Sequence, residues 1–304
     1  MGLQYLPNEQ IDRLKWDKSI HTSGNGLIYA CSFYLDKMAR HWDALVLNDY
    51  EIVMPLTWNK KYGFHYLYQP PFTPCLGIFG NNITTDIFNQ FLSAVPATFR
   101  YWDISLNQGN PFPLKGFKLY QRVNYVLDLD NTYEELFGEY RDNIKRNIKK
   151  SEQAGLIIKT AINSAEVAAL AKKQTGRFSS LKENDFDRFL DLYTFLNEKE
   201  QAASYGVYSP AGQLMASALF LIYKNRAYYI LVGNHPDGKT QGASHALINA
   251  FIKDHAGQKL LLDFEGSDIP GLAFFYNSFG AKEEIYTALR INRLPLLLKW
   301  LKKN

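Results

Sequence analysis

Residues 228–280 constrain the fold of this chain more than any other stretch. An apolar, β-rich run at 228–234 is followed by a loop that contains one proline and two glycines, the second of them Gly242. The next residues carry apolar side chains at three- and four-residue spacing, which is typical of a well-buried helix. A second apolar run ends at Asp263 and Glu265, and a further helix follows. This order of strand, loop, helix, strand and helix predicts a ligand site at the strand ends.

The loop before the first of these helices has the features of an anion site. The first N–H groups of a helix have no intrahelical partner and carry a partial positive charge. Gly242 would let a ligand approach the backbone closely, and Lys239 adds a cation. A pyrophosphate or a carboxylate fits these features, but so does an ordinary strand-to-helix turn with no ligand. Neither the GxxxxGK[ST] order nor GxGxxG is present.

Composition sets the broad class of the protein. The 304 residues suffice for two ordinary domains, and aromatic residues reach 15%. Such rings fill cores and also line clefts for sugars, bases or acyl chains. The formal charge of +4 is only mildly basic, and two cysteines make no disulfide framework. With no signal sequence and no apolar run long enough to span a bilayer, we expect a cytoplasmic protein.

The two halves of the chain share a weak internal repeat. Asp103 ends an apolar run and precedes Val126 by 23 positions, and Asp263 ends another and precedes Thr287 by 24. Similar elements come before each aspartate. The fold predicted from this repeat is α/β (α+β), with two related domains in tandem at residues 1–127 and 128–304.

A basic helix is predicted over residues 132–155, with a capping box at its start and Gly155 at its end. Arg141, Lys145 and Lys149 are four residues apart and therefore share one face, and Arg146 adds to the charge. A cationic face of this kind suits phosphate groups. The alternative is a solvated basic face that binds nothing.

An aromatic, proline-rich loop is predicted over residues 66–80. Its prolines exclude a central strand, and Tyr68 and Phe72 are typical of the wall of a substrate cleft. Asp103 is expected to line the same cleft, between the domains. The alternative is a loop that is packed for structural reasons alone.

Three runs of sequence resemble the Fem-like branch of the acyl-CoA N-acetyltransferase (GNAT) superfamily. The run 141–155 is similar to the Fem-like helix motif R-x-N-I-(R/K)-K-A-x-K-x-G, with Ser151 and Gln153 as departures. The run 263–281 resembles the motif DF-x-G followed by FK-x-FG. The run 239–244 aligns with the pyrophosphate loop [R/Q]xxGx[G/A], with Lys239 and Ser244 as departures. The resemblance implies two tandem GNAT-like domains, each with a mixed, mostly antiparallel sheet flanked by helices.

The resemblance also implies an activity and a set of site residues. The enzyme would be an acyltransferase that moves an acyl or aminoacyl group from acyl-CoA or aminoacyl-tRNA to an amine. The acceptor would be a cell-envelope precursor, such as a peptidoglycan precursor or a nucleotide-linked sugar, or else a polysaccharide sugar. Glu265 or Asp263 would act as base and Tyr276 as acid. The donor would be held by Val232, Gly233, Asn234, Lys239, Gln241, Gly242, Ala243 and Ser244, and the acceptor by Tyr68, Phe72, Asp103, Arg141, Lys145, Arg146 and Lys149.

Two alternatives remain open from the sequence. One is an acyl-CoA-dependent N-acetyltransferase that acts on a small amine, and the other is a non-catalytic binding protein that has kept the fold. The imperfect loop at 239–244 is the reason for the second. No metal site is expected, because the six histidines lack metal-ligand spacing and no CxxC or HExxH motif occurs.

Overall fold

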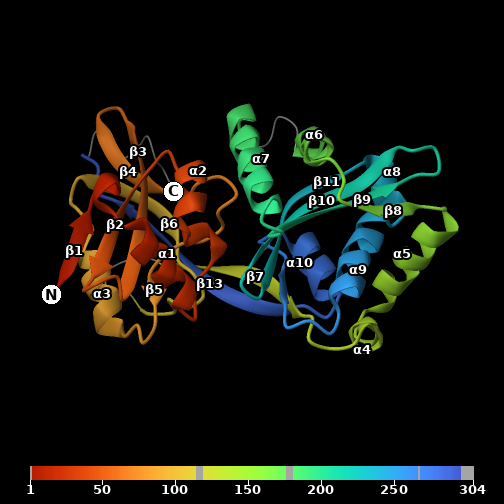
Figure 1. The fold of residues 1–304 in the computed structure, drawn as a ribbon, viewed down its shortest axis with the longest axis horizontal. Coiled ribbons are helices and arrows are strands. Elements are labelled where there is room, and N and C mark those ends of the chain that lie inside the picture. The colour runs from red at the N-terminus through yellow and green to blue at the C-terminus, as the bar shows by residue number, and fades with distance from the viewer. Residues whose placement is uncertain (1, 114–118, 176–180, 266–267, 296–304) are drawn as a thin grey trace. The chain divides into compact units, whose positions relative to one another are not determined.

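The computed structural model describes residues 2–113, 119–175, 181–265 and 268–295 (Figure 1). The chain divides into two compact units. Unit 1 comprises Met1–Arg122 and Ile285–Asn304, and unit 2 comprises Val123–Glu284. Unit 1 is therefore discontinuous in sequence, because the chain returns to it near its C-terminal end. The predicted boundary at 127/128 concerns domains that fold independently and stays a prediction, since compactness alone does not test it.

The sheet of unit 1 has the strand order β1-β2-β3-β4-β6-β13, with β5 paired to β3. Among the described residues every pair is antiparallel except β4 with β6. A turn at residues 48–51 joins β2 to β3, and Asn48 and Tyr50 have positive φ angles there. The strands are β1 Leu3–Leu6, β2 His41–Leu47, β3 Ile52–Lys61, β4 Phe64–Tyr68, β5 Phe79–Gly80, β6 Phe99–Ser105 and β13 Lys282–Asn292.

Helices α1 (Arg13–Thr22), α2 (Ser32–Met38) and α3 (Thr85–Ala94) complete unit 1, with short 3-10 turns at Asn8–Gln10 and Ile28–Ala30. The side chain of Thr84 accepts a hydrogen bond from the backbone N–H of Ile87 and so caps α3. The apolar face of α3 packs on the sheet and supplies much of the core of this unit.

Unit 2 has the strand order β7-β12-β11-β10-β9-β8. Its described pairs are also antiparallel, with the exception of β11 and β12, which run parallel. The strands are β7 Leu119–Asp128, β8 Ile157–Thr160, β9 Ala202–Tyr208, β10 Leu214–Tyr223, β11 Arg226–Asn234 and β12 Leu261–Asp263.

Helices cover both faces of the unit 2 sheet (Figure 1). Helix α9 packs on β9 and β10 and carries α5 on its outer side, whereas α6 packs on β10 and β11 from the other face and contacts α7. Under α9 the rings of Phe220 and Phe251 stack with their centroids 3.9 Å apart. The helices are α4 Tyr133–Gly138, α5 Asp142–Gln153, α6 Ser164–Thr175, α7 Glu183–Asn197, α8 Pro236–Thr240, α9 Ala243–His255 and α10 Pro270–Asn277.

The predicted internal repeat is present in the topology, with one exchange of strands. Strand β4, helix α3 and strand β6 recur as β11, α9 and β12, and each set forms a parallel pair. The strand that follows β6 in the sequence is β7, yet β7 pairs with β12, placing Val126 opposite Asp263. Strand β13 follows β12 and pairs with β6, placing Arg290 opposite Asp103.

Three sequence-based element assignments are wrong in detail. The predicted helix 132–155 is two helices, because the backbone of Arg141 is extended (φ −66°, ψ 153°) and α5 begins only after it. The capping box of Thr132 is confirmed at α4. The predicted loop 66–80 begins inside β4 and ends in β5, and the loop before α9 contains the short helix α8.

Candidate functional site

The parallel strands of unit 2 separate at the end of β12. They are paired from Arg226 opposite Leu261 to Tyr228 opposite Asp263, whereas β11 continues to Asn234. Directly after Tyr229 the β10–β11 register shifts, so that Ile230 is a bulged residue of β11. Residues 229–234 of β11 and residues 264–265 therefore border a gap in the sheet, which we call the unit 2 notch. An extended ligand can bind the open edge of β11 as an added strand.

The N-terminus of α9 lies directly beyond the end of β11 and α8. Its N-cap is Gly242, with φ at +77°, and no side chain caps the helix. A Cβ atom at this position would lie 2.2 Å from the carbonyl oxygen of Asn147 in α5. Gly242 is thus required by the left-handed backbone and by the close approach of α5. The glycine was expected to make room for a ligand, and the structure gives a different physical reason for it.

The predicted donor loop connects the end of β11 to the first turn of α9. The hydroxyl of Ser244 donates a hydrogen bond to the side-chain oxygen of Asn234. The backbone N–H of Asn234 donates to Oε1 of Gln174 in α6, with an N–O distance of 2.6 Å. Lys239 is exposed on α8 and Gln241 is half-buried. The predicted residues of this loop therefore lie close together, between the end of β11 and the first turn of α9.

The remaining predicted donor residues are packed in the structure. Val232 contacts the core under α9, where Ala243 is buried. Gly233 faces α6 instead, and a Cβ atom there would lie 2.7 Å from the backbone nitrogen of Ala171. Consecutive residues of a strand point to opposite faces of the sheet, which accounts for this division, and the bulge at Ile230 determines which of the two residues faces α9.

Glu265 and Tyr276 form the chemically most perturbed pair in this region. Glu265 has a left-handed backbone (φ +64°), and its carboxyl oxygen Oε2 is inaccessible to solvent. Burial raises the pKa of Glu265 well above its ordinary value. The ring of Tyr276 stacks on Phe264 at a centroid distance of 4.6 Å. Burial and then the charge of Glu265 raise the pKa of Tyr276, so the carboxyl and the phenol interact electrostatically.

Asp263 is in a different environment from Glu265. Its Oδ2 atom lies 2.6 Å from Nε of Arg226, and its Oδ1 atom accepts hydrogen bonds from Asn124 and from the backbone of Glu265. Arg226 also forms an ion pair with Glu284. Burial alone would lower the pKa of Arg226, but the two carboxylates raise it above its ordinary value. Asp263 therefore acts as one member of a buried ionic cluster, and Glu265 is the better placed candidate base.

His245 is one of the six histidines for which no metal-binding role is expected from the sequence. It lies in the first turn of α9, and its ring meets Phe275 edge-on at a centroid distance of 4.9 Å. Its Nδ1 atom is buried and has no hydrogen-bond partner among the described residues. Burial lowers the pKa of His245 to about 4, so the imidazole is neutral at pH 7. Its position at a helix start was the only signal in the sequence.

The predicted cationic face is divided by local contacts. Arg141 precedes α5, donates to the side-chain oxygen of Asn277 and lies over the ring of Phe274. Lys145 donates to the carbonyl oxygen of Gly138. Arg146 and Lys149 are exposed, as is the neighbouring Lys150. Because Asn147 contacts Gly242, Arg146 and Lys150 lie on the flank of α5 nearest the start of α9.

The predicted acceptor residues Tyr68, Phe72 and Asp103 belong to unit 1. The hydroxyl of Tyr68, on β4, accepts a hydrogen bond from the backbone N–H of Arg40. Phe72 has a left-handed backbone (φ +54°), and its carbonyl oxygen accepts a hydrogen bond from the hydroxyl of Tyr34. Asp103 forms an ion pair with Arg290 across the β6–β13 register. Tyr68 and Asp103 are register partners at the end of the parallel pair β4–β6, so these two lie together.

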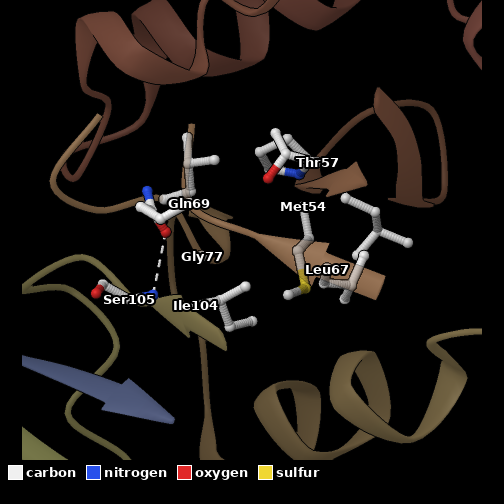
Figure 2. Close-up of a pocket in the computed structure, with 10 residues that line it drawn as sticks. Met54, Thr57, Leu67, Gln69, Gly77, Ile104 and Ser105 are labelled. Carbon is white, nitrogen blue, oxygen red and sulfur yellow. Dashed lines mark hydrogen bonds between the residues drawn. The ribbon is translucent and has the colours of Figure 1, made fainter. Parts of the chain in front are cut away.

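Unit 1 has no open counterpart of the unit 2 notch in its described part. Beyond Asp103, the backbone N–H of Ser105 donates to Oε1 of Gln69 at 3.1 Å. Leu76 then pairs with Leu106 in a parallel bridge, donating to Ser105 and accepting from Asn107. The segment 69–80 thus occupies the gap between β3 and β6. Figure 2 shows the remaining cavity beside Gln69, whose volume of about 10 Å³ holds one water molecule.

In the described residues, no three histidine, cysteine, aspartate or glutamate side chains are grouped as ligands for a metal ion. No described helix combines the length and apolar character needed to cross a membrane.

Comparison with known proteins agrees with this geometry. Residues 138–268, which contain α5, the unit 2 notch and the loop before α9, match a family described as an acetyltransferase (GNAT) domain. The sequence comparison with curated proteins gives no match.

Solved structures share the fold of the whole chain. FemX has 13% sequence identity, 100% coverage of both chains and a TM-score of 0.69. A conserved protein of unknown function from Bacteroides thetaiotaomicron has 11% identity, with 93% of this chain and 99% of that chain covered and a TM-score of 0.61. L-PGS from Bacillus licheniformis has 12% identity, 95% coverage of both chains and a TM-score of 0.58.

The expected resemblance to the Fem-like branch of the GNAT superfamily is confirmed by the GNAT match and by the FemX-like fold. The predicted mixed α/β fold with mostly antiparallel sheets is also confirmed. The match identifies residues 138–268 as a GNAT-type acetyltransferase domain, which supports acyl or aminoacyl transfer as the general chemistry.

Proposed function

We propose that this enzyme transfers an acyl or aminoacyl group to an amine on a cell-envelope precursor, with the donor held in the unit 2 notch. The geometry that carries the proposal is the separation of β11 from β12 at Tyr228, with the bulge at Ile230 beside it. The open edge of β11 lets an extended donor arm pair as a strand. The uncapped start of α9 lies beyond that edge and suits the donor's phosphates.

The proposed chemistry uses the buried pair at the notch. The acceptor amine attacks the carbonyl carbon of the donor, forming the C–N bond and breaking the ester or thioester bond. Glu265 accepts the amine proton directly or through water, and its raised pKa favours that transfer. Tyr276, kept protonated by its raised pKa, donates a proton to the leaving oxygen or sulfur.

The cations of α5 favour a donor with many phosphates. Arg146 and Lys150 flank Asn147, which contacts the N-cap of α9, so they extend the anion site of the loop. Lys239 adds a charge from α8. An aminoacyl-tRNA presents more phosphates to such a surface than acyl-CoA does, and we assign it as the donor. The acceptor would be a peptidoglycan precursor or another nucleotide-linked sugar in the cytoplasm, near Tyr68, Phe72 and Asp103 of unit 1.

Ligand-induced thermal shift tests the donor assignment. A ligand that binds only the folded protein raises its melting temperature by mass action. We expect aminoacyl-tRNA to raise it, with the shift reduced in Arg146→Ala and in Lys239→Ala but retained in Lys159→Ala, a change on the far strand β8. No shift with aminoacyl-tRNA, acetyl-CoA or a nucleotide-linked sugar would overturn the proposal.

The second candidate is an acyl-CoA-dependent N-acetyltransferase that acts on a small amine. The GNAT domain match favours it, because it covers the predicted pyrophosphate loop. A shift with acetyl-CoA that Lys239→Ala abolishes, together with no effect of aminoacyl-tRNA, would establish this candidate instead. In either case Tyr276→Phe should slow the chemical step by about tenfold to a hundredfold and leave donor affinity unchanged.

A further inference from the structure

One end of the unit 1 sheet carries a concentration of positive charge. Lys60 and Lys61 lie at the end of β3, Arg100 lies on β6 and Arg40 directly precedes β2, and all four are exposed. The chain segments that form this end, 38–42, 57–68 and 93–102, contain no aspartate or glutamate. The ion pairs shown for unit 1 use the carboxylates of Asp36, Asp49 and Asp103, which lie outside these segments.

Strand register brings these cations together. Lys61 is opposite Phe64 and Lys60 is opposite His65 across the β3–β4 hairpin. Strand β4 then pairs with β6 next to Arg100, whose guanidinium carbon lies 5.7 Å from the centroid of the Phe64 ring. At the other side, the backbone of Arg40 is hydrogen-bonded to the hydroxyl of Tyr68. Lys60, Lys61 and Arg100 therefore lie around the tip of this hairpin, whereas Arg40, which precedes the register partner of Trp58, lies beside its β3 strand.

Aromatic rings are interleaved with these charges. Tyr62, at the turn, is 71% exposed, and Nζ of Lys61 lies 5.2 Å from its ring centroid. On the face of the hairpin that carries Lys60, His41 stacks on Trp58 at 4.4 Å, and Trp58 meets His65 edge-on at 5.2 Å. We call the set Arg40, Lys60, Lys61, Tyr62, Phe64 and Arg100 the hairpin patch.

We propose that the hairpin patch binds single-stranded nucleic acid. Cations along the strands can contact successive phosphates, and exposed rings between them offer surfaces on which unpaired bases stack. A simple polyanion would need only the cations, whereas the exposed Tyr62 adds a surface suited to a base. The proposal does not depend on the donor assigned above, because the hairpin patch belongs to unit 1 and uses none of the donor residues.

Fluorescence anisotropy with labelled oligonucleotides of about 12 nucleotides tests the proposal, since stacking grooves of this kind cover roughly 4–16 nucleotides. Single-stranded RNA, single-stranded DNA and an RNA duplex are compared at salt concentrations from roughly 50 to 200 mM. The variants are Lys61→Glu and Tyr62→Ala, and Lys18→Glu on α1 is the matched charge control. Both lysines and Tyr62 are exposed, so these changes leave the core intact.

We expect single strands to bind, with affinity falling about tenfold in Lys61→Glu and about fivefold in Tyr62→Ala, and falling steeply with salt. Lys18→Glu should change affinity by less than about twofold. A preference between RNA and DNA strands would identify which of them is the natural ligand. Four results would each overturn the proposal: no binding at the lowest salt, equal losses in both Lys→Glu variants, no loss in Tyr62→Ala, or a duplex bound as tightly as the single strand. Binding of the patch to phosphatidylglycerol vesicles without any binding of oligonucleotides would also overturn it.

Discussion

The carbonyl oxygen of Asn147 lies 2.2 Å from the position that a Cβ atom at Gly242 would occupy. This contact joins the basic helix α5 to the start of α9, and it fixes the position of the proposed phosphate site relative to Arg146 and Lys150. The backbone of Gly242 is also left-handed, at φ +77°. Two separate costs therefore oppose any side chain at this position.

Gly242→Ala should lower the free energy of unfolding by at least about 3 kcal/mol, combining the left-handed strain of about 1–2 kcal/mol with the displacement of α5. Gly257→Ala is the matched control, because Gly257 has φ +78° and no atom near its Cβ position. Comparing the denaturant unfolding of the two variants separates the cost of the left-handed backbone, which both share, from the cost of the steric clash with α5, which only Gly242→Ala has. Equal losses in both would show that α5 does not approach Gly242 as closely as the structure indicates.

The ionic cluster around Arg226 should be a stability determinant of unit 2. Arg226→Met leaves the buried carboxylate of Asp263 and the half-buried carboxylate of Glu284 without their cation, and we expect a loss of about 3–5 kcal/mol. Lys15→Met removes an exposed partner of Asp49 and should cost less than about 1 kcal/mol. Urea unfolding measures both. A loss under 1 kcal/mol for Arg226→Met would contradict the assignment of Asp263 to a structural role.

The order of elements around the notch could be predicted from the sequence. Apolar residues that alternate along a strand, or recur every three or four residues along a helix, mark the side of the element that is buried. The match between Asp103 and Asp263 predicted the repeat, and the two aspartates do occupy the last positions of the two equivalent parallel pairings. The exchange of β7 and β13 was not predictable, since each strand would bury the same apolar side chains in either unit. The break before Arg141 was missed for a related reason, because the apolar stripe of α4 and α5 continues across it.

The site was less predictable than the fold. The distinction between Asp263 and Glu265 depends on Arg226, which lies 37 positions from Asp263 and becomes its neighbour only through the parallel pairing of β11 and β12. The role of Gly242 depends on Asn147 in the same way. Contacts between segments far apart in the sequence decide which polar residue is structural. A pattern of neighbouring residues in the sequence gives no information about such contacts.

Glu265 should make the stability of the protein fall as pH rises. Its folded pKa is raised above the unfolded value of about 4.3, so between those two values the folded state binds more protons than the unfolded state. Stability from this group is complete below about pH 4.3 and is lost as pH rises through the folded pKa. Glu265→Gln should lack this decline. Urea unfolding from acidic to neutral pH tests it, and parallel pH profiles for the two proteins would contradict the burial of the carboxyl.

His245 should make the stability of the protein fall as pH decreases, which is opposite to the effect of Glu265. Burial lowers its pKa to about 4, against about 6.5 in the unfolded chain, so the unfolded state binds the extra proton between these values. Stability from this group is complete above about pH 6.5 and decreases by up to about 3 kcal/mol as pH falls to 4. His245→Phe keeps a ring against Phe275 and removes the titration. If the variant loses stability in acid as steeply as the parent, the histidine is not buried in solution.

The number of donor molecules that each chain binds follows from a difference between the two units, since in the described part of the chain the gap beside the parallel strands is open in only one of them. In unit 1 the bridge between Leu76 and Leu106, together with Gln69, fills the gap that is open in unit 2. Each chain should therefore bind one donor molecule, although its topology contains two equivalent parallel pairs. Isothermal titration calorimetry with the donor should give one site per chain, and Lys239→Glu should weaken binding at that site by about tenfold, because it reverses a charge beside the proposed phosphates.

A result of two sites, or of one tight site that is unaffected by Lys239→Glu, would place a donor in unit 1 and contradict the closure of its gap. Gln69→Ala provides the complementary measurement. It removes only the side-chain hydrogen bond to Ser105, while the backbone bridge at Leu76 remains, so the stoichiometry should stay at one. A second site that appears in this variant would show that Gln69 alone, and not the whole segment 69–80, excludes the donor.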